Sequence, residues 1–106
     1  MSARDERLKE GIRGLAATFL NQESNGSSLI TVTKVELSPD GKRATVFITV
    51  LPEEKEPEAL SFARRQRTEL RGKVIKVLDV SHPPFLEVDI DRGEKNRQRI
   101  DELSQK

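Results

Sequence analysis

The strongest constraint on the fold of this chain is a pair of alternating segments between Leu29 and Leu51. On both sides of a central turn, apolar and polar residues alternate with the period of two that is typical of half-buried strands. The turn, Ser38-Pro39-Asp40-Gly41, combines a proline that fixes φ, an aspartate that binds its own backbone and a glycine that accepts a positive φ. We therefore predict a β-hairpin.

The alternation changes phase inside the first strand of this hairpin. Ile30 and Val32 stand at even positions, whereas Val35 stands at an odd one. A β-bulge near Thr33 and Lys34 restores a single apolar face. Because a two-stranded hairpin is only marginally stable in water, the flanking segments are expected to cover that face.

The composition indicates one small domain. The chain has 106 residues, of which 34% are hydrophobic and 35% are charged, so the core is thin and the surface heavily solvated. It has no Cys, which fits a reducing compartment, and no apolar run long enough to span a membrane. The first ten residues are too charged for a secretory signal, so we predict a cytoplasmic protein with no membrane partner.

An amphipathic helix is predicted at the N-terminus. Ser2 and Asp5 resemble an N-cap pair, the helix is expected to end near Leu20 or Asn21, and residues 21–28 are predicted to form a loop. Two glycines inside the helix suggest a close backbone approach to the sheet. The predicted apolar stripe consists of Leu8, Ile12, Leu15, Ala16, Phe19 and Leu20.

A second helical segment follows the hairpin, after a link at 53–56 that is predicted to be acidic and solvated. Pro57 suits its first turn. Arg67 falls inside the apolar stripe, where a charge is costly, so we predict an ion pair with Glu87 or Asp89. Phe62 projects away from the stripe, which favours a bend between Phe62 and Arg65. The stripe comprises Leu60, Ala63, Arg67, Leu70, Val74 and Val77.

The end of the chain predicts a third strand and a polar extension. His82-Pro83-Pro84 ends the helical segment, and Leu86, Val88 and Ile90 then alternate with acidic residues. We predict one domain over residues 1–91, and a polar tail or short helix over 92–106 in which Ile100 and Leu103 are the apolar anchors.

Positive charge is concentrated in the second helical segment. Between Ser61 and Lys76 there are six Lys or Arg and one Glu, although the net charge of the chain is only +1. Such a segment can neutralise phosphates, or it can be a solvated helix face. All of the four Phe except Phe62 are expected at core-like positions, so shape and backbone recognition is favoured over base stacking. The candidate RNA-binding residues are Arg64, Arg65, Arg71, Lys73 and Lys76, with Lys42 and Arg43 at the hairpin turn as a possible extension, and with Arg4, Arg7 and Arg13 more simply explained as surface decoration.

No catalytic constellation is apparent. His82 is the only histidine, it stands beside two prolines, and there is no Cys. Asp89 and Asp91 are spaced to share the polar face of the last strand, where a hard cation is conceivable, but solvated carboxylates are the simpler explanation. We predict no catalytic residue, no metal, no cofactor and no small-molecule substrate.

The residues resemble one family. Three stretches carry the similarity: Val32 to Leu51 with its Ser-Pro-Asp turn, Arg67-Thr68-Glu69-Leu70, and Arg99 to Leu103 with the sequence R-I-D-E-L. Together with the element order they resemble the ribosome-binding factor A family. The resemblance implies an α+β fold that is KH-like, with the type II order α-β-β-α-β and helices on one face of a three-stranded sheet. It also implies a kinked central helix in place of the GxxG loop.

The resemblance also implies a function. It suggests a monomeric assembly factor that binds the immature small (30S) ribosomal subunit and its 16S rRNA, and that assists late maturation and rRNA processing without enzymatic activity. Two alternatives remain open from the residues alone. One is a KH-like RNA-binding module with another target, and the other is a protein-interaction module with an acidic partner.

Overall fold

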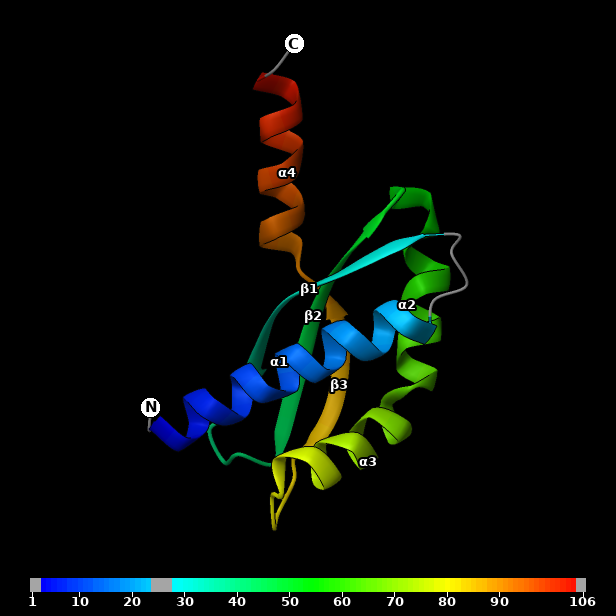
Figure 1. The fold of residues 1–106 in the computed structure, drawn as a ribbon. Coiled ribbons are helices and arrows are strands. Elements are labelled where there is room, and N and C mark those ends of the chain that lie inside the picture. The colour runs from blue at the N-terminus through cyan, green and yellow to red at the C-terminus, as the bar shows by residue number, and fades with distance from the viewer. Residues whose placement is uncertain (1–2, 24–27, 105–106) are drawn as a thin grey trace.

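The computed structural model describes residues 3–23 and 28–104 and shows an α+β domain built on a three-stranded sheet (Figure 1). The elements are α1 (Ala3–Glu23), β1 (Leu29–Leu37), β2 (Arg43–Leu51), a short 3-10 turn η1 (Glu53–Lys55), α2 (Glu56–Arg65), α3 (Arg67–Leu78), β3 (Phe85–Ile90) and α4 (Arg92–Ser104). The sheet order is β1-β2-β3, with β1 antiparallel and β3 parallel to β2. The predicted fold class is therefore confirmed.

The hairpin forms as predicted. The register shifts between Val32 and Lys34, which is where the change of phase placed a bulge. In the turn, Gly41 has a φ of +71° and its N–H donates to the Ser38 carbonyl at 2.9 Å, while the Asp40 carboxylate accepts from the Lys42 N–H at 3.0 Å. The local turn chemistry thus fixes the reversal, and the bulge keeps the apolar side chains of both halves of β1 on one face.

The core lies between one face of the sheet and the helices α1, α2 and α3. Figure 1 shows α1 crossing in front of the sheet, with α2 and α3 packed along the side of β3. Burial of each large apolar side chain contributes about 1.5–3 kcal/mol, which outweighs the cost of the glycines in α1. The fully or nearly fully buried residues include Ile12, Ala16 and Leu20 of α1, Val46 and Ile48 of β2, Leu70 and Val74 of α3, and Leu86, Val88 and Ile90 of β3.

Helix α1 differs from its prediction in two respects. It continues to Glu23, beyond the expected end near Leu20 or Asn21, so residues 21–23 are helical and not a loop; Ser2 and residues 24–27 lie outside the described residues. The two glycines do not approach the sheet. A Cβ at Gly11 meets Leu78 of α3 at 2.9 Å, whereas a Cβ at Gly14 has no neighbour within 4 Å. Of these two glycines, only Gly11 has a close packing neighbour, and that neighbour is a flexible side chain.

The last predicted position of the central helical stripe, Val77, was wrong. Val77 is 62% exposed, and Leu78 packs against the core in its place. The stripe of α3 runs through Leu70, Val74 and Leu78, which recur every four residues along this helix.

Of the polar tail or short helix predicted for residues 92–106, the structure shows a helix, α4. It runs from Arg92 to Ser104 and projects away from the sheet (Figure 1). Ile100 and Leu103, predicted to be apolar anchors, are 61% and 69% exposed. The N-terminal part of the helix is attached to the acidic link. Lys95 Nζ lies 3.0 Å from a Glu53 carboxylate oxygen and 2.9 Å from one of Glu56, and Arg99 also pairs with Glu53. The acidic link at 53–56 is therefore a docking point for α4 and not simply solvated.

The start of α4 is held by Asp91. Its carboxylate accepts a hydrogen bond from the Glu94 N–H at 3.0 Å, as an N-cap does, and another from the Thr33 hydroxyl at 2.6 Å. Thr33 is the bulged residue of β1, so the phase change in the hairpin also positions the first turn of α4. The Thr33 hydroxyl, followed by the Glu94 N–H, lowers the pKa of Asp91 below its usual value.

We expect Gly14→Ala to raise the free energy of unfolding by about 0.5–1 kcal/mol, because alanine has the higher helix propensity and meets no neighbour there. Gly11→Ala gains the same propensity but forces the Leu78 side chain to move, so its gain is smaller or negative. Urea denaturation of both variants measures the difference. Equal stabilisation by the two substitutions would contradict this packing account of Gly11.

Asp91→Ala is expected to destabilise α4 by about 1 kcal/mol at neutral pH, through loss of the cap. The folded-state pKa of Asp91 is depressed, so its ionised carboxylate stabilises the fold above the ordinary aspartate pKa of about 3.9. This contribution to stability is lost as the pH falls below that value. Amide hydrogen exchange in α4, measured at neutral and acidic pH, tests this.

Thr33→Val is the matched variant. It removes the hydroxyl that is the largest cause of the lowered pKa of Asp91, and it keeps the shape of the side chain. In this variant the pKa of Asp91, followed by NMR titration, should move up toward its usual value. An unchanged pKa would show that the Thr33 hydroxyl does not stabilise the carboxylate.

Candidate nucleic-acid interface

The central helical segment is divided into α2 and α3 by a break at Gln66. The bend predicted between Phe62 and Arg65 therefore exists but lies at the following residue, and it needs no glycine. Gln66 has φ −88° and ψ −1°, and its N–H donates to the Ala63 carbonyl at 3.1 Å. Phe62 is half-buried against the core, as the bend allows.

Arg67 stabilises this break. Its Nε donates to the Arg64 carbonyl at 2.9 Å, which supplies a hydrogen bond to a carbonyl at the C-terminal end of α2. Its Nη1 lies 2.9 Å from a carboxylate oxygen of Glu87 on β3, which confirms the predicted ion pair. One side chain thus ties the end of α2 to the sheet, and its charge is matched by a carboxylate.

Arg64 and Arg71 lie along the free edge of β3. The Arg64 Nε donates to the Val88 carbonyl at 3.3 Å, and the Arg71 Nε and Nη2 donate to the carbonyls of Pro84 and Pro83 at 3.1 and 3.0 Å. Backbone carbonyls of an edge strand otherwise need solvent or another strand. Because a carbonyl carries no net charge, these bonds orient the two guanidinium groups without neutralising them.

An open depression of about 510 Å³ lies where α2 meets α3. Arg65 stands at its rim, with Nη1 donating to the Ser61 hydroxyl at 3.0 Å. Arg64, Arg65 and the carboxylate-paired Arg67 therefore line one concavity, and the planar, permanently charged groups of Arg64 and Arg65 suit phosphate oxygens. The lining residues are Pro57, Leu60, Ser61, Arg64, Arg65 and Arg67.

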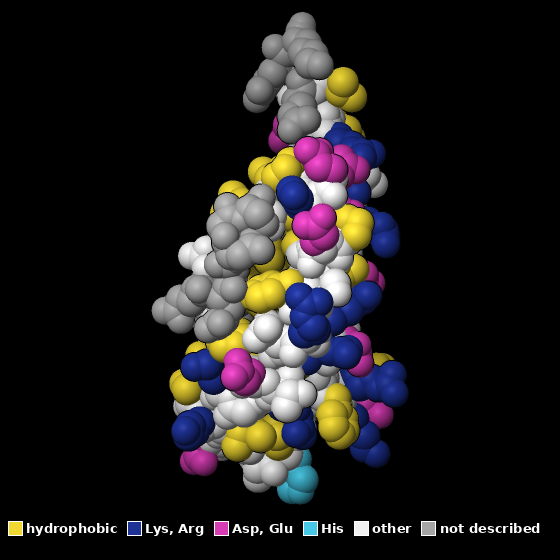
Figure 2. Space-filling model, turned by 90° about the vertical axis from the view of Figure 1, so that its right-hand side faces the viewer, with side chains coloured by type: hydrophobic (Ala, Val, Ile, Leu, Met, Phe, Trp, Pro, Cys, Tyr) yellow, Lys and Arg dark blue, Asp and Glu magenta, His cyan; other side chains and the backbone are white. Residues whose placement is uncertain are grey.

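Lys73 does not join this group, and Lys76 is exposed on α3. Side chains two residues apart on a helix point in different directions, so Lys73 leaves α3 on another side than Arg71. Its Nζ lies 5.4 Å from the ring centre of Phe19 in α1. Figure 2 shows the side of the molecule on which α2 and α3 lie. Lys and Arg side chains are spread over its middle and lower parts, with acidic side chains among them. The predicted basic segment is thus divided between the β3 edge and the α1 side of α3.

Lys42 and Arg43 lie near Arg71 although they are far from it in sequence. The Phe85 N–H donates to the Lys42 carbonyl at 2.9 Å, and Arg43 is the register partner of Phe85 in the parallel pair. The Arg71 guanidinium carbon lies 4.6 Å from the centre of the Phe85 ring. The hairpin end and α3 therefore present one cationic cluster around Phe85.

The expectation that Phe85 occupies a core-like position was wrong. Phe85 is 63% exposed, because Leu86, Val88 and Ile90 take the core face and place Phe85 on the opposite one. Phe47 also lies on that outer face, half-buried, with Lys34 Nζ 5.0 Å from its ring centre. The alternation of β3 was the signal that could have identified Phe85 from the sequence.

The acidic and histidine candidates have other surroundings. The Asp89 carboxylate accepts from the Ile90 N–H at 2.8 Å, whereas Asp91 lies past the end of β3 and caps α4, so the two do not share one strand face. His82 is exposed in the loop before β3. Within residues 3–23 and 28–104, no group of three or more His, Asp or Glu could hold a metal ion, and no helix is long and apolar enough to cross a membrane.

The element order and the one-sided helical cover define an α+β domain of the KH-like type II topology. A sequence model of the family described as ribosome-binding factor A matches residues 4–104. The chain belongs to the ribosome-binding factor A family.

Two relatives show the range of similarity. The ribosome-binding factor A of Beutenbergia cavernae is 34% identical over 104 residues, which cover 95% of this chain but only 65% of that protein. That of Macrococcus caseolyticus is 31% identical over 111 aligned positions, covering 98% of this chain and 97% of the relative. This chain therefore spans just under two thirds of the first relative and nearly all of the second.

Solved structures share the fold. The crystal structure of the Thermus thermophilus factor has a TM-score of 0.71 at 24% identity, over 82% of this chain and 96% of that one. A homology model of the Thermus thermophilus factor, fitted into a cryo-EM map of its complex with the 30S subunit, has a TM-score of 0.68 at 23% identity, over 88% and 97% of the two chains.

We expect Arg67→Gln to lower the free energy of unfolding by about 1 kcal/mol, mostly through the lost hydrogen bond to the Arg64 carbonyl. The ion pair adds less, because the Arg67 and Glu87 side chains are 40% and 49% exposed. A double-mutant cycle with Glu87→Gln, followed by urea denaturation, should give a coupling energy of about 0.2–1 kcal/mol. A coupling that accounts for the whole effect of Arg67→Gln would contradict this division.

Proposed function

We propose that this chain is a non-enzymatic assembly factor that binds the immature small (30S) ribosomal subunit through its 16S rRNA and assists late maturation and rRNA processing. The family match over residues 4–104 supports this function. The observation that supports this interface is the position of Arg64 and Arg71 along the β3 edge. Both are held by neutral carbonyls and keep their full charge.

The binding surface in this proposal comprises the depression at the helix break and the cluster around Phe85. Phosphate contacts by arginines release condensed counterions from RNA, so much of the affinity is electrostatic and falls with salt. Because the guanidinium groups are oriented before binding, fewer side-chain rotamers are lost when phosphates arrive. The proposed contact residues are Arg64, Arg65, Arg71, Lys42 and Arg43, with Lys73 and Lys76 as peripheral contacts.

The proposed action is binding and not chemistry. A factor that binds one conformation of an RNA more tightly than another shifts the population toward that conformation and dissociates when it is lost. The sequence supports this, since it offers one histidine and no cysteine as potential nucleophile or base. In this proposal residues 1–91 are the RNA-binding domain, α4 is an appended helix, and the protein acts as a cytoplasmic monomer.

The test reverses charge at the helix break. Arg64→Glu together with Arg65→Glu should abolish co-sedimentation with immature small subunits in a sucrose gradient, because phosphate attraction becomes repulsion. Binding of the wild-type protein to small-subunit rRNA should also weaken with salt, with a log–log slope of about 0.7–0.9 per phosphate contact. Thermal unfolding checks that the double variant remains folded.

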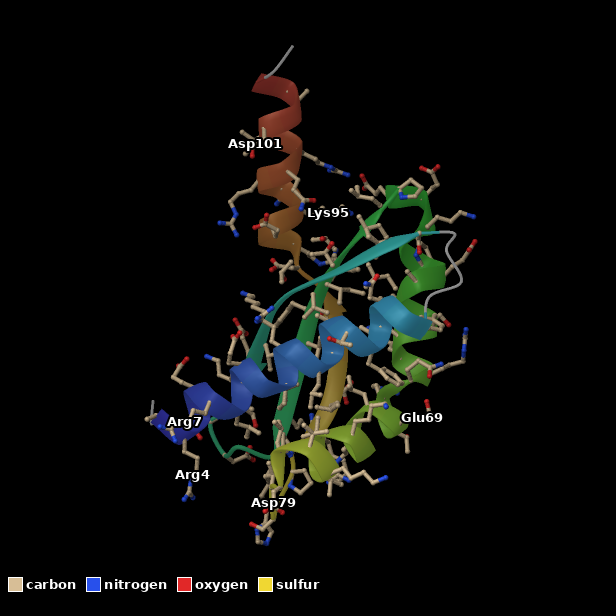
Figure 3. All side chains as sticks on the ribbon, viewed as in Figure 1. Arg4, Arg7, Glu69, Asp79, Lys95 and Asp101 are labelled. Atoms are coloured by element: carbon tan, nitrogen blue, oxygen red, sulfur yellow. The ribbon has the colours of Figure 1, made fainter. Side chains whose placement is uncertain are left out.

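Arg4→Glu together with Arg7→Glu is the matched control, since it changes the net charge equally. Figure 3 shows Arg4 and Arg7 at the N-terminal end of α1, on the other side of the molecule from Glu69 and the start of α3. This control should retain most of the subunit binding. Equal loss in both double variants would indicate a response to net charge, and no loss in either would remove the α2 and α3 arginines from the interface. Retained subunit binding with weak RNA affinity at every salt concentration would favour an acidic protein partner.

A further inference from the structure

The outer end of β3 carries an exposed aromatic ring in a cationic setting. Phe85 begins β3 on the sheet face that no helix among α1, α2 and α3 covers, and 63% of it is exposed. The Arg71 guanidinium lies 4.6 Å from its ring centre and is fixed there by hydrogen bonds to the carbonyls of Pro83 and Pro84. The Phe85 ring is thus held between the start of β3 and the anchored Arg71 side chain, and it remains accessible.

The backbone beneath the ring is equally constrained. The Phe85 N–H donates to the Lys42 carbonyl, which attaches the start of β3 to the end of the hairpin. Arg43 is the register partner of Phe85, so its side chain leaves the same face of the sheet one strand away. Among the described residues, the side chain of Arg43 has no hydrogen-bond or ion-pair partner, whereas the Lys42 ammonium interacts electrostatically with Asp40. Arg43 and Arg71 therefore flank one ring.

The neighbouring carboxylates do not cancel this charge. Glu87 lies 2.9 Å from Arg67, and Glu36 lies 3.0 Å from Lys34. Asp40 accepts hydrogen bonds from the Ser38 hydroxyl and the Lys42 N–H inside the turn, and these lower its pKa, so it is held within the turn as an anion. The cluster remains positively charged, which suits a phosphate.

We propose that Phe85 is a stacking site for one unpaired RNA base, with Arg43 and Arg71 contacting the phosphates on either side of that nucleotide. Every base has a π-face, and stacking on an aromatic ring beside arginines is a common way to hold unpaired nucleotides. This inference rests on the proposed function and adds to it that the bound RNA presents an unpaired nucleotide at this end of the sheet.

The adjacent row of the sheet limits the site to about one nucleotide. Glu36, Thr45 and Glu87 are register partners, so this row places two carboxylates beside the position of Phe85 and Arg43. Because both carboxylates are paired, Glu87 with Arg67 and Glu36 with Lys34, this row offers no unpaired cation for a further phosphate on the open face of the sheet. In this proposal the RNA strand therefore runs from the Phe85 ring toward α3, where Arg71 leads to the arginines at the break between α2 and α3.

The experiment uses two RNA hairpins, one blunt and one with a single-stranded 3′ tail that contains 2-aminopurine. Phe85→Leu should weaken binding to the tailed hairpin by about 5- to 150-fold, the factor that corresponds to the stacking of one base. Phe85→Trp should retain the affinity of the wild-type protein and its change in 2-aminopurine fluorescence. Binding to the blunt hairpin should be the same for all three proteins.

Phe47→Leu is the matched control, because Phe47 lies on the same face but is half-buried beside Lys34. It should leave tail binding unchanged. Thermal unfolding of each variant verifies the fold, which the exposure of Phe85 makes tolerant of substitution.

Several outcomes would overturn the stacking site. These are unchanged tail binding by Phe85→Leu, equal losses in the Leu and Trp variants, or an equal loss on the blunt hairpin. Loss of subunit binding with unchanged RNA binding would instead assign the ring to a protein contact. If Arg64→Glu with Arg65→Glu abolishes RNA binding while Phe85→Leu does not, the proposed function stands and only the stacking site fails. If the wild-type protein binds neither small subunits nor their RNA, the proposed function itself fails.

Discussion

The hydrogen bonds from the arginines of the central helices to the free edge of β3 have two effects. They attach these helices to the sheet, and they set which charges the surface displays. Arg64 and Arg71 each donate to backbone carbonyls of β3 or of the segment that leads into it. These bonds cover an edge that could otherwise pair with another strand. They also hold two cations outward in fixed positions, so the same contacts serve stability and display charge.

Arg67 has a different role, although it lies between Arg64 and Arg71 in the sequence. It spans the break between α2 and α3 by bonding the Arg64 carbonyl, and its charge is balanced by Glu87. A helix break without glycine or proline needs such support, because the carbonyls at the end of the first helix lose their helical partners. The break in turn creates the depression in which Arg64 and Arg65 converge. A residue that contributes little net charge thus shapes the charged site.

The hairpin has consequences beyond its own strands. Its bulge places Thr33 against Asp91, which caps α4 at the point where that helix leaves the sheet. At its other end, the hairpin carries Lys42 and Arg43 to the start of β3. Both effects follow from the parallel pairing of β2 with β3, which brings distant parts of the chain to the two ends of one strand.

Much of the fold could be predicted from the sequence because the relevant signals are local. The phase change between Val32 and Val35 predicted the bulge. The charge of Arg67 within an apolar stripe predicted an ion pair with Glu87 or Asp89, and the structure shows the pair with Glu87. The errors have a common cause. Val77, Ile100 and Leu103 were assigned to apolar contacts, yet all three are exposed, since neighbouring elements and not residue type decide whether an apolar side chain is covered.

The sequence by itself determined the strands, their turn, the helical stripes and the concentration of positive charge, because period and turn chemistry act over a few residues. Only the tertiary structure decided which cations share a surface. Lys73 is two residues from Arg71 but leaves α3 on another side, whereas Arg43 is far away in the chain and adjoins it across Phe85. Proximity in space depends on strand register and helix rotation, which long-range packing sets and local sequence does not specify.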